Sequence, residues 1–260
     1  MRKSYWYSDW CRCIFSAKFL LAVGGVFLVH ILIMQRDANR EVISVLDGFN
    51  RIWGSNGKAL CYLFTTLAYG QCFAEDLEQG YAKYEIIRGS TGRYVISKCV
   101  FIAVSANAAL VAGRLLFVLF LRIQYPWEIG VGEKEILNFN NGFVSLLEGE
   151  KYPAYFFLSG FSEGIWAAIL ALLAAITTFY TGNQLLVLAF PIVANHLIRR
   201  VLLVAAPGWD LDPSHLFSIV YNRFDQEWRS LGAAAIIGII VFVLTSLIIY
   251  ASMERRMTHG

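Results

Sequence analysis

Six apolar runs constrain the fold of this 260-residue chain more than any other feature. A helix needs about 20 predominantly apolar residues to cross the hydrocarbon core of a bilayer. The second run is short, because its 16 residues would extend only about 24 Å as a helix, and we expect it to continue into the acidic stretch that follows. The pattern predicts an all-α, polytopic membrane protein with six transmembrane helices in a single domain, 1–260. The runs are Ala17–Met34, Ala59–Ala74, Cys99–Leu121, Ala154–Tyr180, Gln184–Ile198 (with Pro191 inside) and Leu231–Ala251.

Composition supports the membrane assignment and argues against nucleic acid as a partner. Hydrophobic residues make up 57% of the chain and charged residues 16%, whereas soluble chains have about 45–50% and about 25%. The net charge of +3 is too small to predict nucleic-acid binding. The cysteines form no CxxC pair and are interpreted as small apolar residues, with lipidation or metal binding at Cys11 and Cys13 as the alternative. They are Cys11, Cys13, Cys61, Cys72 and Cys99.

The two ends of the chain are predicted to lie in the cytoplasm. An even number of spans places both ends on one side of the membrane. Lysine and arginine are balanced between the two sides, but both ends are basic and the segment Glu128–Lys151 is acidic, as expected for an outer loop. In the leader, 1–16, the residues Trp6, Trp10 and Cys13 recur at helical spacing. Aromatic rings prefer the headgroup region, so the leader is predicted to be an interfacial helix.

The segment 75–98 separates the second and third runs and carries charge and tyrosine. Its acidic part is followed by Lys83–Arg88, a glycine- and serine-containing turn, and Arg93-Tyr94. Leu77, Tyr81 and Tyr84 fall close to one face of a helix over Glu75–Arg88, and such a helix could dock on another protein. A helix lying on lipid is the alternative, but its carboxylates would be repelled by an anionic leaflet.

Two charged residues lie within apolar runs, Arg114 in the third and Glu163 in the fourth. Burying a charge in lipid costs at least about 2.5–3.5 kcal/mol at the helix centre, so both are candidates for a substrate path. They could pair at a similar depth, or Arg114 could reach the outer headgroups alone. Asn195 and His196 are further candidates for this path, although they could simply mark the end of the fifth span.

No catalytic motif is found. Gly54–Lys58 lacks the spacing of a phosphate-binding loop, and the four histidines show no metal-ligand spacing. We therefore expect no enzyme activity, no metal and no cofactor in this chain. Between the fifth and sixth runs, the region 199–230 contains Val201–Ala206 and a piece that begins at Asp212. Their shortness and the Pro207-Gly208 turn predict short re-entrant outer helices.

The chain resembles the permease subunits of type-two ATP-binding cassette exporters. The layout agrees along nearly the whole chain, and a local pattern of an acidic helix, a basic-serine-basic turn, a tyrosine and a lysine covers about 26 positions. This pattern is carried by Phe73, Asp76, Gly80, Arg88, Ser90, Arg93, Tyr94, Ser97 and Lys98. The short second span and the charged residues Arg114 and Glu163 depart from the family's pattern and leave the polarity of the substrate open.

The resemblance implies that 75–98 is a coupling-helix loop seated on a separate ATPase subunit. It further implies a second permease copy or paralogue, membrane lipid as surroundings, and ATP and Mg bound by the partner ATPase. The chain would then be a multi-pass protein of the bacterial plasma (inner) membrane that exports a peptide, antibiotic, lipid-like or similar amphipathic molecule. The residues expected at the ATPase are Glu75, Asp76, Glu78, Gly80, Tyr81, Tyr84, Arg88, Ser90 and Arg93.

Two other classes of function stay open. One is a non-transporting membrane sensor or immunity protein built on the same scaffold. The other is an intramembrane enzyme, which is less favoured because the polar residues form no nucleophile–base set in the sequence.

Overall fold

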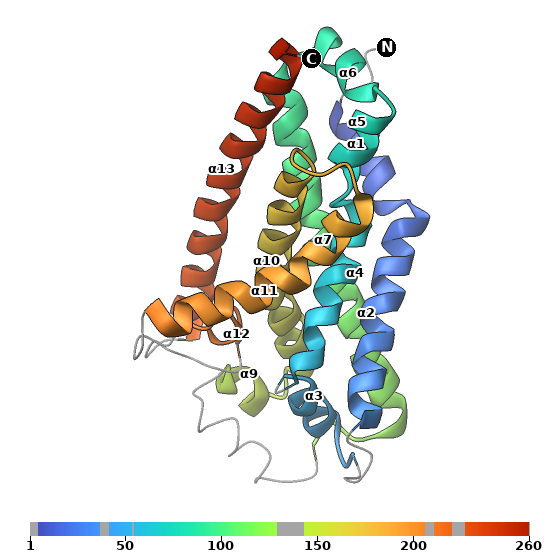
Figure 1. The fold of residues 1–260 in the computed structure, drawn as a ribbon. Coiled ribbons are helices and arrows are strands. Elements are labelled where there is room, and N and C mark those ends of the chain that lie inside the picture. The colour runs from blue at the N-terminus through green and yellow to red at the C-terminus, as the bar shows by residue number, and fades with distance from the viewer. Residues whose placement is uncertain are drawn as a thin grey trace.

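The computed structural model describes residues 5–36, 42–53, 55–128, 143–205, 211–219 and 227–259. In this part of the chain every regular element is helical, so the all-α class is confirmed (Figure 1). The elements are α1 (Tyr5–Ile14), α2 (Ala17–Arg36), α3 (Val45–Trp53), the 3-10 turn η1 (Asn56–Lys58), α4 (Ala59–Tyr69), α5 (Cys72–Glu78), α6 (Tyr81–Arg88), α7 (Thr91–Gln124), α9 (Val144–Glu148), α10 (Tyr152–Thr177), α11 (Gln184–Ala205), α12 (Pro213–Leu216) and α13 (Glu227–His259).

Five helices are long and apolar enough to cross a membrane, namely α2, α7, α10, α11 and α13. The second predicted span differs from this pattern because its helix breaks after Tyr69 and resumes as α5. Just before the break, the hydroxyls of Thr65 and Thr66 donate hydrogen bonds back to the Tyr62 carbonyl, an arrangement that bends helices. The 11 residues of α4 extend only about 16 Å.

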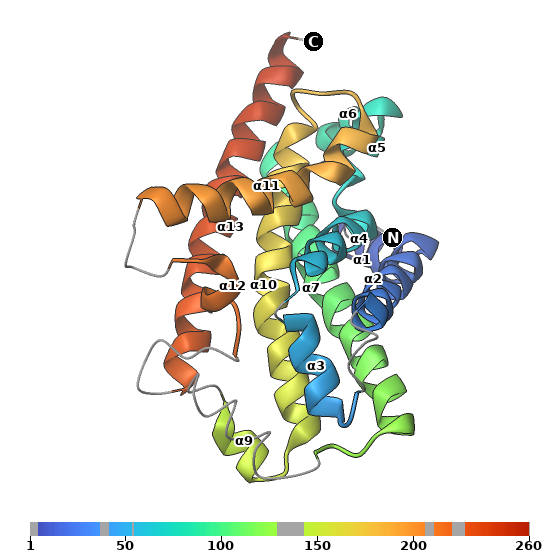
Figure 2. The same ribbon diagram turned by 60° about the horizontal axis from the view of Figure 1, so that its bottom comes forward.

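The helices α7 and α10 form the centre of the bundle, with α10 the most buried of the five long helices. Figures 1 and 2 show α2 and α4 on one side of this pair, α13 on another side, and α11 running obliquely across the bundle. Glycines permit α7 to approach α2 and α10 closely. A Cβ on Gly113 of α7 would lie 2.6 Å from Val26 of α2, and one on Gly164 of α10 would lie 2.6 Å from Asn107 of α7. Small residues at such contacts are typical of packed membrane helices.

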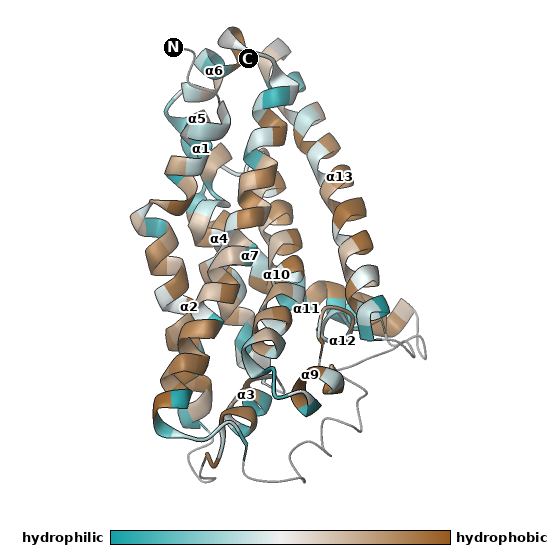
Figure 3. Cartoon of the chain, turned by 180° about the vertical axis from the view of Figure 1, so that it is seen from behind, coloured by the Kyte–Doolittle hydropathy of each residue, from teal (hydrophilic) through white to brown (hydrophobic). Residues whose placement is uncertain are grey.

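The two ends of the bundle carry different elements. The helices α1, α5 and α6 lie at the same end as the C-terminal part of α13, whereas α3 and α9 lie at the opposite end (Figures 1 and 3). The start of α1 and the end of α13 thus lie at one end of the bundle, whereas a shared side of the membrane for both termini stays a prediction. That this side is the cytoplasm stays a prediction. The predicted outer loop Glu128–Lys151 lies largely outside the described residues, apart from α9 and its neighbours.

The predicted fifth span was too short. The helix α11 continues from Gln184 through Ile198 to Ala205, so the apolar piece after Arg200 is its last turn and not a separate re-entrant helix. The charge of Arg199 does not end the helix, because its guanidinium binds Asp212, with Nη2 2.9 Å from Oδ2. Within the described part of region 199–230, α12 is the other helical piece before α13 begins.

The leader that was predicted to be an interfacial helix contains a helix, α1, which packs on α7. The rings of Trp6 and Trp10 make T-shaped contacts with the Phe101 ring, whose centroid lies 5.7 and 6.1 Å from theirs. Both indoles stay partly exposed, whereas Cys13 is buried. The helix therefore has one face on the bundle and one aromatic face free for a headgroup layer.

Candidate functional site

The segment between α4 and α7 contains two helices and not the single helix over Glu75–Arg88 that the sequence indicated. The chain turns between α5 and α6 at Gly80, whose φ of +68° lies in the left-handed region. This conformation costs a side chain energy and favours glycine. Gly80 thus acts as a joint that directs α6 away from α5.

The surface of α6 is partly apolar and exposed. Tyr84 is 65% and Ile87 79% exposed, and Tyr81 is partly exposed beneath the Arg12 guanidinium, 5.6 Å from its ring centroid. A hydrogen bond with Glu85 raises the pKa of Tyr81. The side chain of Arg88 lies outside the described part of the chain. At this end of the bundle, α6 therefore presents an aromatic and aliphatic surface with charge beside it.

The other predicted coupling residues surround α6. Glu78 accepts a 2.6 Å hydrogen bond from Gln184 at the start of α11, and Glu75 forms an ion pair with Lys18 of α2. Ser90 caps the N-terminus of α7 by accepting a 3.4 Å hydrogen bond from the Arg93 amide. These contacts fix the segment against three of the long helices.

Asp76 does not belong to this surface. Its side chain is 0% exposed. It accepts hydrogen bonds from Arg12 (3.1 Å) and Tyr94 (2.9 Å), and it forms an ion pair with Lys98 (2.9 Å). A buried carboxylate with three cationic or hydroxyl partners cannot reach a docked protein. The expectation that Asp76 contacts the ATPase is therefore corrected: it belongs to the interior.

Asp76 is part of a group of mostly buried side chains that we term the inner polar cluster, in which Arg12 is partly exposed. Its members are Asp9, Arg12, Tyr69, Asp76, Tyr94, Ser97 and Lys98. Lys98 lies at the centre, with Nζ 2.9 Å from Asp9 Oδ1 and from Asp76 Oδ2, and it donates a 3.0 Å hydrogen bond to the Tyr69 hydroxyl. Tyr69 in turn donates to Asp9 at 2.7 Å, and Ser97 donates to the other Asp9 oxygen.

The inner polar cluster is closed and charge-balanced. Two carboxylates face two cations, and none of its buried side-chain nitrogen or oxygen atoms lacks a partner among the described residues. The cluster connects α1, α4, α5 and α7. The sequence did not indicate that Asp9 and Tyr69 belong to such a cluster. The available signal was that Asp9, Arg12 and Cys13 share one face of α1.

A second group, the outer polar cluster, lies nearer the opposite end. Its members are His30, Lys58, Tyr62, Arg114, Tyr155, Ser159 and Glu163. Arg114 Nη2 donates to Glu163, and Nη1 donates to the Ser159 carbonyl and hydroxyl at 3.2 and 3.3 Å. Tyr62 donates to Glu163 at 3.2 Å, and Lys58 Nζ lies 4.0 Å away. The predicted pairing of Arg114 with Glu163 is confirmed, and the alternative that Arg114 reaches headgroups alone is wrong.

The remaining predicted path residues do not join this cluster. Asn195 is buried, and its side chain accepts a 2.9 Å hydrogen bond from Trp166 Nε1. Trp166 lies on α10, about one helical turn after Glu163. His196 is exposed on α11. The four residues therefore do not form one continuous lining.

Cys61 lies beside His30 of the outer polar cluster, a contact that the sequence did not reveal. The Cys61 sulfur is 4.0 Å from His30 Nδ1, but the same nitrogen contacts the Val26 carbonyl at 2.6 Å. Both side chains are buried. A catalytic thiol needs a free base and access to substrate, so this pair does not have the geometry of a nucleophilic site.

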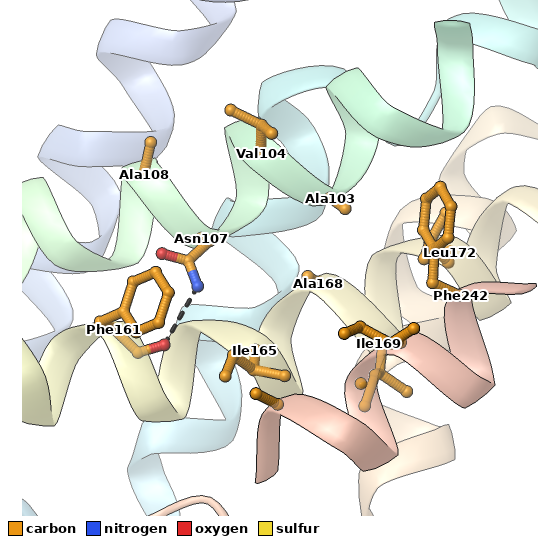
Figure 4. Close-up of a pocket in the computed structure, with 13 residues that line it drawn as sticks. Ala103, Val104, Asn107, Ala108, Phe161, Ile165, Ala168, Ile169, Leu172 and Phe242 are labelled. Carbon is orange, nitrogen blue, oxygen red and sulfur yellow. Dashed lines mark hydrogen bonds between the residues drawn. The ribbon is translucent and has the colours of Figure 1, made fainter. Parts of the chain in front are cut away.

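An open cavity of about 450 Å³ lies between α7, α10 and α13. Figure 4 shows small side chains, Ala103 and Ala168, beside Ile169 and Phe242 in its wall, with Asn107 pointing between the helices and donating a 3.0 Å hydrogen bond to the Phe161 carbonyl. Ligand pockets commonly have volumes of about 300–1,000 Å³. The cavity therefore suits an apolar molecule or acyl chain.

Outside the long helices, Asp212 forms a local polar site. It caps α12 by accepting a 2.8 Å hydrogen bond from the Ser214 amide and pairs with Arg199. Burial alone would raise the pKa of Asp212, but the hydrogen bonds from Arg199 and Ser214 lower it below its ordinary value. Asp212 is thus held as a carboxylate.

In the described part of the chain, no group of three or more His, Cys, Asp and Glu side chains could hold a metal ion. No family model matches this chain, and no match was found among the curated proteins or the solved structures.

Proposed function

We propose that this chain is the transmembrane permease subunit of an ATP-binding cassette exporter of the bacterial inner membrane. A separate ATPase subunit would bind ATP and Mg and dock on α6. The observation that carries the proposal is the exposed Tyr84 and Ile87 surface on a short helix between a membrane helix and α7, at the end shared by α1 and the end of α13.

This surface suits a protein partner better than lipid. Aromatic and large aliphatic side chains dominate the energy of protein interfaces. Glu78 and Glu85 lie beside it, and an anionic leaflet would repel them. A protein groove with basic residues would accept both the apolar surface and the carboxylates.

The inner polar cluster supplies a route by which movement of α6 would reach the membrane helices. It joins α5 to α1 and α7 through Lys98, which contacts Asp9 and Asp76. Buried ionic contacts resist separation, because splitting them leaves uncompensated charge. In the proposed cycle, ATP binding to the partner favours one arrangement of the α5–α6 segment, and α7 tilts with it.

The outward-facing helices support a second copy or paralogue in the assembly. Of the five long helices, α11 and α13 are the least buried, and their exposed side chains include Leu186, Leu197, Ile239 and Leu247. Such apolar faces would contact lipid or another permease. The exported molecule would be amphipathic, with its apolar part suited to the cavity between α7, α10 and α13.

The docking surface can be tested by introducing charge on α6. The change of Tyr84 and Ile87 to aspartate should abolish co-purification of the ATPase and its stimulation by the permease, while the melting temperature of the permease stays unchanged. Ile123→Asp is the matched control, because Ile123 is 84% exposed at the opposite end of α7. Unchanged co-purification and stimulation in the Tyr84 and Ile87 variant would overturn the proposal.

A further inference from the structure

A second cavity, of about 380 Å³, lies at the junction of α1, α2, α4 and α5. Its walls are the end of α1, the start of α2 and the break between α4 and α5. Figure 1 shows α1 and α5 together at one end of the bundle, above α2. Ligand pockets commonly have volumes of about 300–1,000 Å³, so this cavity has the size of a binding site.

Three charged side chains line this cavity, the cations Arg12 and Lys18 and the carboxylate Glu75. Lys18 and Glu75 form an ion pair, and their side chains are 45% and 23% exposed. An ion pair that is open to solvent contributes little to stability, so each group can exchange its partner for a group of a ligand.

The Arg12 guanidinium has donors left for an anion. Among the described residues it donates one hydrogen bond, from Nη2 to Asp76 at 3.1 Å. A guanidinium carries five N–H donors, and its planar fork matches a phosphate group. The cavity thus combines two cations that can bind a phosphate with a carboxylate that can bind an ammonium group.

The cavity lies at the depth of the lipid headgroups. Lys18 is the second residue of α2, whose apolar span begins at Ala17. The indoles of Trp6 and Trp10 are partly exposed on α1, and tryptophan prefers the headgroup region. Phe15, which also lines the cavity, is 79% exposed. Cations beside an exposed aromatic ring at the start of a membrane helix match the boundary between headgroups and hydrocarbon.

An exposed apolar stripe on α2 continues from the cavity. Ala17 lines the cavity, and the exposed Leu21, Leu28 and Leu32 follow it on the same face of the helix. A Cβ on Gly24, which lies between them, would have no neighbour within 4 Å. The stripe from Leu21 to Leu32 extends about 16 Å, and one leaflet contributes about half of a hydrocarbon core of about 30 Å. An acyl chain can therefore lie along α2 below the cavity.

We infer that this cavity binds the headgroup of a phospholipid that carries ethanolamine, from the leaflet at the end of the bundle where α1 lies. The phosphate accepts hydrogen bonds from Arg12 and Lys18, and the primary ammonium group donates to Glu75. Glu75 would repel a headgroup that carries negative charge alone, and the quaternary ammonium of choline has no N–H to donate. The bound lipid would hold α1 against α5. The inference does not depend on the proposed function.

Three phospholipids with identical acyl chains and with ethanolamine, choline or glycerol headgroups are the probes. Purified full-length protein in detergent is titrated with each lipid, and native mass spectrometry gives the apparent dissociation constant of the first lipid bound. We expect the ethanolamine lipid to bind about tenfold more tightly than the other two, because they lack one charge-assisted hydrogen bond. Soluble phosphoethanolamine should bind far more weakly, because it lacks the acyl chain that contacts α2. Equal binding of phosphoethanolamine would overturn the assignment to a lipid.

Two variants separate the roles of the cation and the carboxylate. Lys18→Met should weaken the binding of all three lipids by about tenfold, because each carries the phosphate. Lys83→Met, at an exposed lysine of α6 outside the cavity, is its control. Glu75→Gln should abolish the preference for ethanolamine over glycerol. Glu78→Gln, at an exposed position on the same helix, should keep that preference.

Equal affinity of the three lipids for the unaltered protein, or a preference for choline or glycerol, would overturn the inference. A preference for ethanolamine that persists in Glu75→Gln would also overturn it. Melting in detergent without lipid checks that each variant is folded. If Lys18→Met does not fold, the comparison of Glu75→Gln with Glu78→Gln still decides the result.

Discussion

The inner and outer polar clusters place charge inside the same helix bundle in different ways. In the inner cluster, Asp9 and Asp76 are balanced by Lys98 and Arg12, and its hydroxyl partners are used. In the outer cluster, two cations share Glu163, and polar atoms of three residues have no hydrogen-bond partner among the described residues. A closed network holds helices together at fixed positions, whereas an open one leaves capacity for a ligand or a change of state.

The largest expected effect is at the centre of the inner cluster. Lys98→Met would leave two buried carboxylates with Arg12 as their remaining cation, and we expect destabilisation by about 4–5 kcal/mol. Lys83→Met is the matched control, because Lys83 is exposed on α6 at the same end. Melting in detergent measures both. Equal melting temperatures for the two variants would show that the inner cluster does not stabilise the fold.

A smaller loss is expected when one partner of the outer pair is removed. Arg114→Ala leaves Glu163 with Tyr62 and Lys58 nearby, so we expect destabilisation by about 3 kcal/mol, the lower end for a broken buried pair. The double change with Glu163→Ala should be less destabilising than the sum of the two single changes. Additive losses in a double-mutant cycle would show that the two side chains are not energetically coupled.

The smallest effects distinguish paired from unpaired hydroxyls. Tyr94→Phe removes a hydrogen bond to buried Asp76 and should cost about 1–2 kcal/mol. Tyr155→Phe removes a hydroxyl that has no partner among the described residues and should be near neutral. The melting temperatures of the two variants give the comparison. A larger loss for Tyr155→Phe than for Tyr94→Phe would mean that the assignment of open and closed clusters is reversed.

The sequence predicted those features that depend on local pattern and depth. Apolar length predicted the five helices that are long enough to cross a membrane, together with a sixth span that the structure breaks after Tyr69. Similar depth suggested that Arg114 and Glu163 could pair. The helix break at Gly80 had a weaker signal, because a glycine in a helical pattern is compatible with either outcome.

Burial of Asp76 could not be predicted in the same way. Its partners Arg12, Tyr94 and Lys98 come from two other helices, and a charged residue next to Glu75 and Glu78 looks solvent-exposed in one dimension. The extension of α11 past Arg199 could not be predicted for the same reason, because the partner of Arg199 is Asp212 in the following loop. Charge marks the end of a membrane helix only when tertiary structure supplies no partner.

We propose that α6 is the surface on which an ATPase acts, with the inner polar cluster behind it. The most direct measurement replaces Tyr84 with a photoreactive amino acid in membranes of the native host, and a second variant carries the same group at Ile123. The account predicts a crosslink from position 84 to an ATP-binding cassette ATPase, identified by mass spectrometry and retained on immobilised ATP, and none from position 123. Crosslinking of position 84 to lipid alone, or of position 123 to the ATPase, would contradict it.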